Sequence, residues 1–311
     1  MKSTKLILLH PTIQKQSSSN TNRLWLILII TFFTTAFTLI LITTAAAAAA
    51  TSTATGSAAS SFQLRLSISN ALLHYTAITN STHMTSTKLA TVTAAIARCA
   101  TAASLCNLLI FGHTHEALLY TALNFNGRTV ILDEDEHLIL RFEQQHLGIE
   151  AYDMKYYEMR VSEMKRLLES ARGKFCGECR PVQNLLFSEC KLALNSLRNH
   201  VYQLSWDVIL IDGPSEYHEA APGRMSAIFT AAVLARSKKG RAAETHVFVQ
   251  DFDREAERGY SDEFLCRDNL VEVVGKLGHF VVERASDERL TTEFCRVSAL
   301  ANSSSSSTSM A

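Results

Sequence analysis

Asp212 lies at the end of an apolar run, Val208 to Ile211, and a Gly-Pro pair and a polar loop with Tyr217 and His218 follow it. A continuous apolar run that stops at an acid and a Gly-Pro pair is typical of a buried parallel strand that leads into a loop. Ligands of open α/β sheets bind at the carboxyl ends of such strands. We therefore predict that Asp212 meets a substrate, a metal or a cofactor, with Tyr217 and His218 beside it.

A second group of polar residues follows the apolar run Asn107 to Phe111. Gly112 comes directly after this run, and Asp133, twenty-one residues later, ends another apolar run. In dinucleotide-binding folds a glycine at the first place lets the backbone approach the ligand, and an acid about 20 residues on accepts the ribose hydroxyls. The predicted cofactor-binding residues are Gly112, Glu116, Asp133, Glu134 and Asp153. The alternative is a plain Rossmann-like core without a ligand, because the loop His113 to His115 has side chains where glycines are usual.

Strands and helices alternate along the chain between these residues. The predicted strands are Asn107 to Phe111, Thr129 to Leu132, Ile149 to Tyr152, Val208 to Ile211, His246 to Val249 and Phe280 to Glu283. The predicted helices are Glu116 to Leu123, one with Tyr157, Val161, Met164 and Leu168 on one face, and one with Pro222 in its first turn. This alternation predicts a mostly parallel sheet with helices on both faces. The order of elements matches the class I methyltransferase (Rossmann-like) fold.

The amino-terminal part contains nineteen residues without a charge, Leu24 to Ile42. At about 1.5 Å per residue this run spans about 28 Å, which is enough to cross a bilayer core. Four basic residues and no acid precede it, so we predict a type II single-pass anchor with the carboxyl-terminal part in the lumen. The alternatives are a cleaved signal peptide, which normally has a shorter apolar region, and a mitochondrial presequence, which is amphipathic.

Composition divides the rest of the chain. We predict a cytoplasmic tail over residues 1–23, an Ala/Thr/Ser-rich stem over 43–61, a folded lumenal domain over 62–296 and a disordered Ser-rich tail over 297–311. Acidic and basic residues are equal in number, at 30 each, and the part that follows the apolar run carries a formal charge of −4. No basic patch for nucleic acid emerges, so we predict that nucleic acid is not a partner.

Seven cysteines follow the apolar run. An odd number in an oxidising compartment predicts three disulfides and one further thiol, with fifteen pairings of six partners open. Among these we predict the sequential pairing, Cys99 with Cys106, Cys179 with Cys190 and Cys266 with Cys295. The alternative for Cys176 and Cys179 is a redox or zinc half-site, although no second pair accompanies them. Asn80 and Asn302 begin acceptor sequences for glycosylation.

Several longer blocks resemble one plant family. They read KLILLHP near the amino terminus, then CNLLIFGHTHEALL, NGRTVILDEDE, CRPVQNLLFSEC, WDVILIDGP, APGRMSAIFTAAVLARS, THVFVQDFDR and EFLCRDNLVE. These blocks are similar to the irregular-xylem-fifteen and fifteen-like proteins, whose wider family includes the glucuronoxylan 4-O-methyltransferases. The resemblance covers about Cys99 to Arg296 together with the first forty residues.

The resemblance implies a Golgi membrane protein needed for xylan or glucuronoxylan synthesis in secondary cell walls, with other xylan-synthesis proteins as partners. For the enzymatic branch it implies methyl transfer from S-adenosylmethionine to the 4-hydroxyl of glucuronic acid side chains. The stretch YHEAAPGRM is similar to that branch, whereas His113 to His115 and Ser215-Glu216 depart from it. A carbohydrate methyltransferase and a non-catalytic member of a xylan-synthesising assembly therefore both stay open.

Methyl transfer to a sugar hydroxyl needs a base or a metal near the oxygen. We predict that Asp212 and Asp251, at the ends of adjacent strands, hold a divalent metal or orient the hydroxyl, and that His218 is the base. Arg224 suits the planar carboxylate of glucuronate, and Tyr217 is the second predicted substrate-binding residue. The structural alternatives are a loop-capping role for Asp212, a solvated His218 and an Arg224 that pairs with a glutamate.

Overall fold

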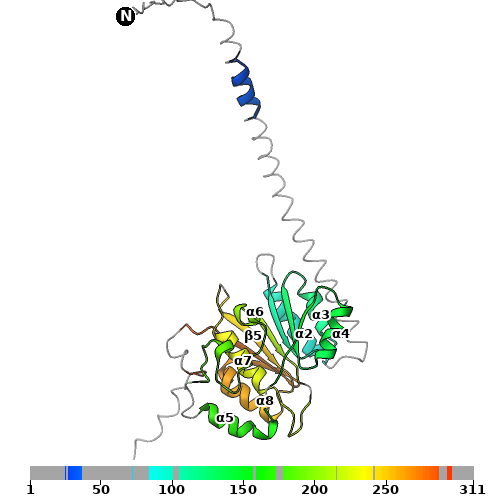
Figure 1. Ribbon diagram of the computed structural model, residues 1–311, viewed down its shortest axis with the longest axis vertical. Helices are drawn as coiled ribbons and strands as arrows, with labels where there is room; N and C mark the ends of the chain where they lie inside the picture. The colour runs from blue at the N-terminus through cyan, green and yellow to red at the C-terminus, as the bar shows by residue number, and fades with distance from the viewer. Residues whose placement is uncertain are drawn as a thin grey trace, which may run out of the picture. The chain divides into compact units, whose positions relative to one another are not determined.

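The computed structural model describes residues 25, 27–36, 72, 84–100, 105–156, 159–172, 178–214, 216–240, 242–286 and 293–295. The chain divides into two compact units, Met1–Leu66 and Ser67–Ala311 (Figure 1). In the first unit residues 27–36 are helical, and Thr31 and Thr35 donate hydrogen bonds to carbonyls one turn earlier. None of the helices in the described ranges is long and apolar enough to cross a membrane.

Several predictions concern residues outside these ranges. They include the rest of the predicted anchor over 24–42, the tails over 1–23 and 297–311, the stem over 43–61, and the glycosylation acceptors Asn80 and Asn302. These remain predictions.

The second unit is built around a sheet of seven strands in the order β3-β2-β1-β4-β5-β7-β6. The strands are β1 Asn107–Phe111, β2 Arg128–Asp133, β3 Glu150–Asp153, β4 Val208–Ile211, β5 Glu244–Val249, β6 Leu270–Val274 and β7 Leu277–Glu283. The first five strands in this order are parallel, and β7 is antiparallel to both β5 and β6. The strands β1 and β4 lie at the centre and are apolar throughout their buried length, as is typical of a parallel sheet covered on both faces.

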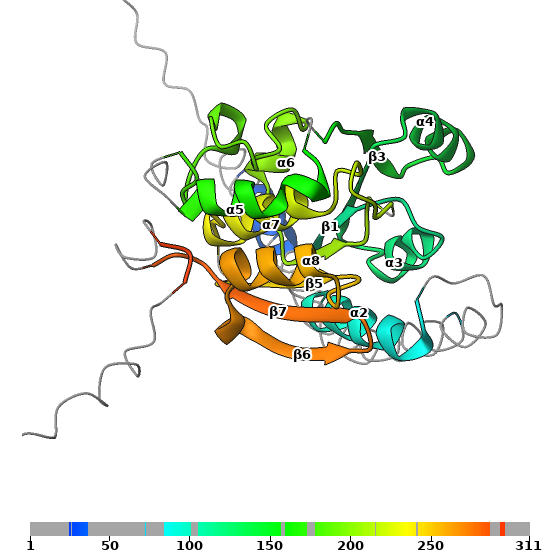
Figure 2. The ribbon, with the colours of Figure 1, turned by 90° about the horizontal axis from the view of Figure 1, so that it is seen from below.

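Helices cover both faces of the sheet and give two cores (Figure 2). One face is covered by α2 Ser86–Cys99, α3 Ala117–Leu123 and α4 Glu136–Gln145, and the other by α5 Met164–Arg172, α6 Asn199–Gln203, α7 Met225–Arg236 and α8 Glu255–Tyr260. Every residue of α7 is buried, which agrees with a sequence that is apolar except at Ser226, Thr230 and Arg236. The prediction of a mixed α/β, Rossmann-like fold is confirmed.

Two predicted helix starts were wrong. The last predicted helix begins at Met225, so Pro222 precedes it by three residues instead of lying in its first turn. Gly223 has a left-handed φ of 64°, which a helix does not allow, and this delays the start. The helix predicted to carry Tyr157, which lies outside the described ranges, begins only at the short 3-10 turn Val161–Glu163 that leads into α5.

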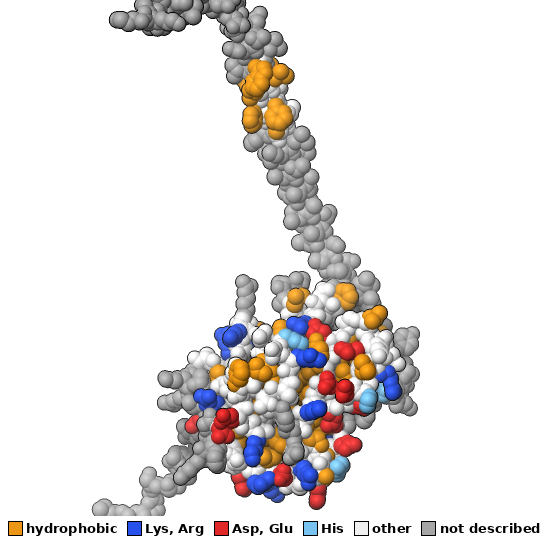
Figure 3. All heavy atoms as spheres, viewed as in Figure 1, with side chains coloured by type: hydrophobic (Ala, Val, Ile, Leu, Met, Phe, Trp, Pro, Cys, Tyr) orange, Lys and Arg blue, Asp and Glu red, His pale blue; other side chains and the backbone are white. Residues whose placement is uncertain are grey.

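The sequential disulfide pairing is confirmed. The bridges join Cys99 to Cys106, Cys179 to Cys190 and Cys266 to Cys295, whereas Cys176 lies outside the described ranges. The first bridge ties the end of α2 to the residue before β1. On the face of the second unit shown in Figure 3, acidic and basic side chains are interspersed, and no field of one sign covers it.

Candidate functional site

A cavity of about 490 Å³ opens at the carboxyl ends of β1, β4 and β5. The loop after β1 lines it with His113, Thr114 and His115, and the ends of β4 and β5 line it with Asp212, Gln250 and Asp251. Four cationic side chains also line the cavity, namely Lys88, Arg224, Arg254 and Lys276. Three of the predicted site residues, Asp212, Arg224 and Asp251, are therefore brought together here, whereas the other predicted residues lie outside the lining.

The loops after β1 and β4 begin in direct contact. Gly112 has a left-handed φ of 98°, and a Cβ atom there would lie 2.3 Å from the backbone nitrogen of Gly213. The backbone N–H groups of Asp212 and Gly213 both donate to the carbonyl of Phe111 at 2.8 Å. In this strand order the chain runs outward from β1 to β3 and returns at β4, so the contact lies at the topological switch point. The contact with Gly213 by itself requires glycine at position 112.

The carboxylate of Asp133 holds the backbone that follows β1. One oxygen accepts from the N–H of His113 at 2.6 Å and the other from the N–H of Asp135 at 2.9 Å. A carboxylate offers about four lone-pair sites, so two acceptor sites remain for the hydroxyls of a ligand. The neighbouring acids Glu134 and Asp153 are exposed to solvent. The part of the Glu134 carboxyl that is withdrawn from water raises its pKa, and the negative charges of Asp133 and Glu216 add to this effect.

Glu116 is buried beneath the loop after β1. Its Oε1 accepts from the backbone N–H of Met84 at 3.2 Å, and Oε2 has no hydrogen-bond partner among the described residues. The same holds for two buried atoms on the neighbouring loop, His113 Nε2 and Thr114 Oγ1. The His113 ring packs edge-on against Phe142, with 4.4 Å between ring centroids, and burial lowers its pKa. The loop therefore carries unpaired polar atoms at the wall of the cavity.

Arg224 links the residues that follow β4 and β5. Its side chain is 2% exposed, and it donates to the carbonyls of Asp212 and Gln250 at 2.8 Å and to Asp251 Oδ2 at 3.0 Å. Glu257, also buried, lies 4.0 Å from its Nη1 atom. These protein groups hold both Nη atoms, and Nε is buried without a partner among the described residues. The geometry therefore favours a positioning role for Arg224 over direct contact with a substrate carboxylate.

Asp251 is held between two guanidinium groups. Its Oδ2 lies 3.0 Å from Arg224 and 2.8 Å from Arg254, and its backbone has a left-handed φ of 55°. Two guanidinium groups beside one carboxylate repel a divalent cation and occupy the oxygen that would bind it. Asp212 and Asp251 therefore do not fit the predicted metal. Among the described residues the one grouping with metal-ligand geometry contains Cys99 and Cys106, whose sulfurs form a disulfide.

The loop residues Tyr217 and His218 lie to the side of the cavity. His218 is exposed, and its Nε2 lies 3.3 Å from Glu216 Oε2. Arg254, which lines the cavity, stacks over the Tyr217 ring at 4.5 Å, and burial, with a smaller effect of Glu257, raises the pKa of Tyr217. Of the predicted catalytic groups, Asp212 and Asp251 thus line the cavity and His218 does not.

Sequence reasoning missed four polar residues of the lining, Lys88, Gln250, Arg254 and Lys276, and the apolar Leu138. One signal was present for Lys88, because it shares the buried side of α2 with Leu89, Val92 and Ile96. A lysine within an apolar helical stripe indicates either a buried partner or a ligand. Arg254 and Lys276 belong to loops without a periodic pattern, and no local signal marks them.

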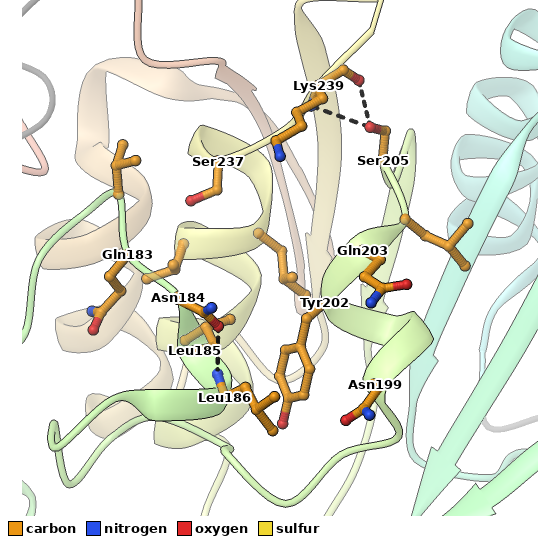
Figure 4. Close-up of a pocket in the computed structure, with 14 residues that line it drawn as sticks. Gln183, Asn184, Leu185, Leu186, Asn199, Tyr202, Gln203, Ser205, Ser237 and Lys239 are labelled. Atoms are coloured by element: carbon orange, nitrogen blue, oxygen red, sulfur yellow. Dashed lines mark hydrogen bonds between the residues drawn. The ribbon is translucent and has the colours of Figure 1, made fainter.

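A second cavity, of about 470 Å³, lies near the amino end of β4 (Figure 4). Amide and hydroxyl side chains line it, but several are already bonded within the protein. Tyr202 bonds both the Leu197 N–H and the Leu194 carbonyl, and Asn184 accepts from the Leu186 N–H. It contains none of the predicted site residues, so the chemistry is concentrated at the other end of the sheet.

Comparison with known proteins identifies the family. The family model described as IRX15/IRX15L/GXM matches residues 89–280. From Arabidopsis thaliana, Protein IRX15-LIKE is 47% identical over 94% of this chain and 93% of its own, and Protein IRREGULAR XYLEM 15 is 46% identical over 94% of each. Glucuronoxylan 4-O-methyltransferase 1 is 35% identical over 72% of this chain and 77% of its own. No solved structure matches. The predicted resemblance is confirmed, and the chain belongs to the IRX15/IRX15L/GXM family.

Proposed function

We propose that this chain acts in xylan biosynthesis and transfers a methyl group from S-adenosylmethionine to a hydroxyl of a uronic acid on xylan. The names of its relatives support the pathway, because they include glucuronoxylan 4-O-methyltransferases. A parallel sheet with a switch point between β1 and β4 supports a class I methyltransferase-like fold. The observation that carries the proposal is one cavity that joins Asp212, at the end of β4, to the loop after β1.

The residues around the loop after β1 fit the cofactor. Gly112 brings the backbones of two loops together, and Asp133 keeps two acceptor sites that suit ribose hydroxyls. His113 Nε2 and Thr114 Oγ1 are buried without partners among the described residues, so they suit the polar groups of the cofactor. When bound, S-adenosylmethionine supplies an electrophilic methyl group on a sulfonium.

Asp212 is the residue best placed to act on the acceptor hydroxyl. Its side chain is 7% exposed and lines the cavity. A sugar hydroxyl is a weak nucleophile, so a carboxylate that accepts its hydrogen bond orients the oxygen and takes up the proton as the oxygen–methyl bond forms. Arg224 fixes the carbonyls of Asp212 and Gln250 and thereby the ends of both strands. The exposed His218, 3.3 Å from Glu216, is less well placed for this proton transfer.

Titration and turnover of the full-length chain in detergent test the proposal. We expect heat on titration with S-adenosylhomocysteine and transfer of labelled methyl to glucuronoxylan. Asp212→Asn should lower turnover by about 100-fold or more, as for loss of a general base, with unchanged affinity for S-adenosylhomocysteine. The matched control is Asp268→Asn, an exposed acid outside the cavity lining. Unchanged turnover in Asp212→Asn would remove Asp212 from the mechanism, and absence of heat would reject the enzymatic function.

A second candidate is a non-catalytic member of a xylan-synthesising assembly. It is favoured by the three side chains of His113 to His115, where a close backbone approach to a cofactor would favour glycine. The two relatives that match 94% of the chain also bear names without a reaction. Binding of xylan oligosaccharides with no response to S-adenosylhomocysteine would support this candidate.

We also propose a type II Golgi membrane protein with a lumenal domain. The uncharged run Leu24 to Ile42, the basic residues before it and three disulfides support this topology. A carboxyl-terminal tag in sealed Golgi vesicles should resist protease until detergent is added. Digestion without detergent would reject the topology.

A further inference from the structure

Lys88 carries a buried charge at the wall of the cavity. It lies in the first turn of α2, and 6% of its surface is exposed. Its Nζ donates to Gln250 Oε1 at 3.3 Å. Within the described ranges no carboxylate lies within 4.0 Å of this nitrogen, and no further hydrogen bond is made by its other two N–H groups. The charge of Lys88 is therefore not balanced by its described surroundings.

The other cations of the cavity have acidic partners. Arg224 and Arg254 share Asp251 at 3.0 Å and 2.8 Å, and Lys276 lies 3.2 Å from Asp253. Lys88 differs from them, although burying an unpaired cation is costly. Its place in the first turn adds to the cost, because the amino-terminal end of a helix is itself positive. A buried lysine without an acidic partner is suited to binding a negatively charged ligand.

The position of Lys88 separates it from the loop that suits the cofactor. Its bond to Gln250 places it at the end of β5, and its Cε lies 3.4 Å from where a Cβ atom of Gly275 would be, in the turn between β6 and β7. In the order β1-β4-β5 it is two strands from β1, about 10 Å at the usual strand spacing. Asp212, at the end of β4, lies between the two. This arrangement puts Lys88 on the acceptor side of the carboxylate.

We infer that the ammonium group of Lys88 binds the carboxylate of the acceptor's uronic acid and makes the cavity selective for acidic over neutral sugars. The inference rests on the proposed function for the identity of the acceptor. In a hexuronic acid the carboxylate and the 4-hydroxyl are attached to neighbouring ring carbons. A lysine that holds the carboxylate at the end of β5 therefore orients the adjacent hydroxyl toward Asp212 at the end of β4. Arg224 holds both strand ends through the hydrogen bonds of its Nη atoms to the carbonyls of Asp212 and Gln250.

Kinetics of the full-length chain with two acceptors test the inference. One acceptor is a xylan oligosaccharide with a glucuronic acid branch, and the other is the same oligosaccharide after reduction of the carboxyl group. Lys88→Met should raise KM for the acidic acceptor about 10- to 100-fold, the usual range for a charged hydrogen bond, and leave KM for S-adenosylmethionine unchanged. Lys88→Arg should recover part of the loss. The matched control is Lys239→Met, which lines the other cavity.

Two outcomes would overturn the inference. If Lys88→Met raises KM for S-adenosylmethionine and not for the acceptor, then the lysine binds the carboxylate of the cofactor's methionine part. If the wild-type chain uses both acceptors equally well, then the cavity does not select the acid. The second comparison needs no variant, so it stays decisive even where Lys88→Met folds poorly.

Binding without the cofactor separates this inference from the proposed reaction. Isothermal titration with the acidic and the reduced oligosaccharide reports recognition in the absence of turnover. Binding that requires both the carboxylate and Lys88, in a chain that transfers no methyl group, would refute the reaction and support the inference. Methyl transfer that is indifferent to Lys88 would support the reaction and refute the inference.

Discussion

Replacing Arg224 with methionine should destabilise the folded domain by about 3–5 kcal/mol, the usual cost of breaking a buried ion pair from one side. The structure shows where this cost arises. The variant loses two hydrogen bonds to backbone carbonyls, at 2.8 Å each, and one to Asp251, which keeps Arg254 at 2.8 Å. The Asp212 carboxylate, of which 7% is exposed, loses the cation at 4.0 Å. Glu257, whose side chain is fully buried, loses the cation at 4.0 Å, and its carboxyl oxygens have no hydrogen bond among the described residues. The stranded Glu257 carboxylate should dominate the loss.

The assay is urea denaturation followed by the fluorescence of Trp206, a fully buried reporter in the same domain. Burial raises the pKa of Glu257, and Arg224 opposes this shift. Without Arg224 the folded-state pKa rises further above the unfolded value, so protonation favours the folded form and the loss should be smaller at pH 5 than at pH 7.5. Adding Glu257→Met should restore about 1–3 kcal/mol at pH 7.5. A single-variant loss below 1 kcal/mol, or no recovery in the double variant, would refute the reasoning.

Three further predictions concern the fold. Gly112→Ala should cost about 2–4 kcal/mol in urea denaturation, because a Cβ would meet Gly213 at 2.3 Å and φ is 98°; a cost below 1 kcal/mol would contradict this close contact. Replacing Cys179 and Cys190 by serine opens a loop with a separation of 11 residues and should cost about 2–3 kcal/mol, and an unchanged urea midpoint would argue against it. Burial lowers the pKa of His246 to about 4, so the unfolded chain binds the proton more readily below about pH 6.5 and the domain should lose about 1 kcal/mol by pH 5. His246→Gln should flatten this pH dependence of the melting temperature, and an equally steep profile would point to other groups.

The central strands could be predicted from the sequence because burial on both faces leaves a continuous apolar run. Strands β1 and β4 have the predicted bounds, and β2 and β3 differ from them by one residue at each end. Strand β5 begins two residues and β7 three residues before the predicted start. Strand β6 was missed because it is a largely exposed edge strand in which Glu272 interrupts the apolar residues. Runs of apolar residues therefore predicted the central strands of the sheet better than the strand at its edge.

The two acids of the site could be predicted because they follow strands. Asp212 and Asp251 follow β4 and β5 within two residues, and parallel strands bring their carboxyl ends to one edge of the sheet. The partners of each charge could not be predicted, since Arg224 reaches Gln250 and Asp251 through packing that no local pattern encodes. Lys88 likewise meets Gln250 across 162 positions of sequence.

The contact between Gly112 and Gly213 restricts how these two loops can evolve. A Cβ at Gly213 would lie 2.4 Å from the Cα of Gly112, so each residue excludes a side chain at the other. A side chain introduced at either position would clash with the backbone of the other loop. A single substitution at either glycine is therefore excluded unless the loops move apart. New substrates are therefore more readily reached through changes in the side chains around the cavity than through changes in the two glycines at its base.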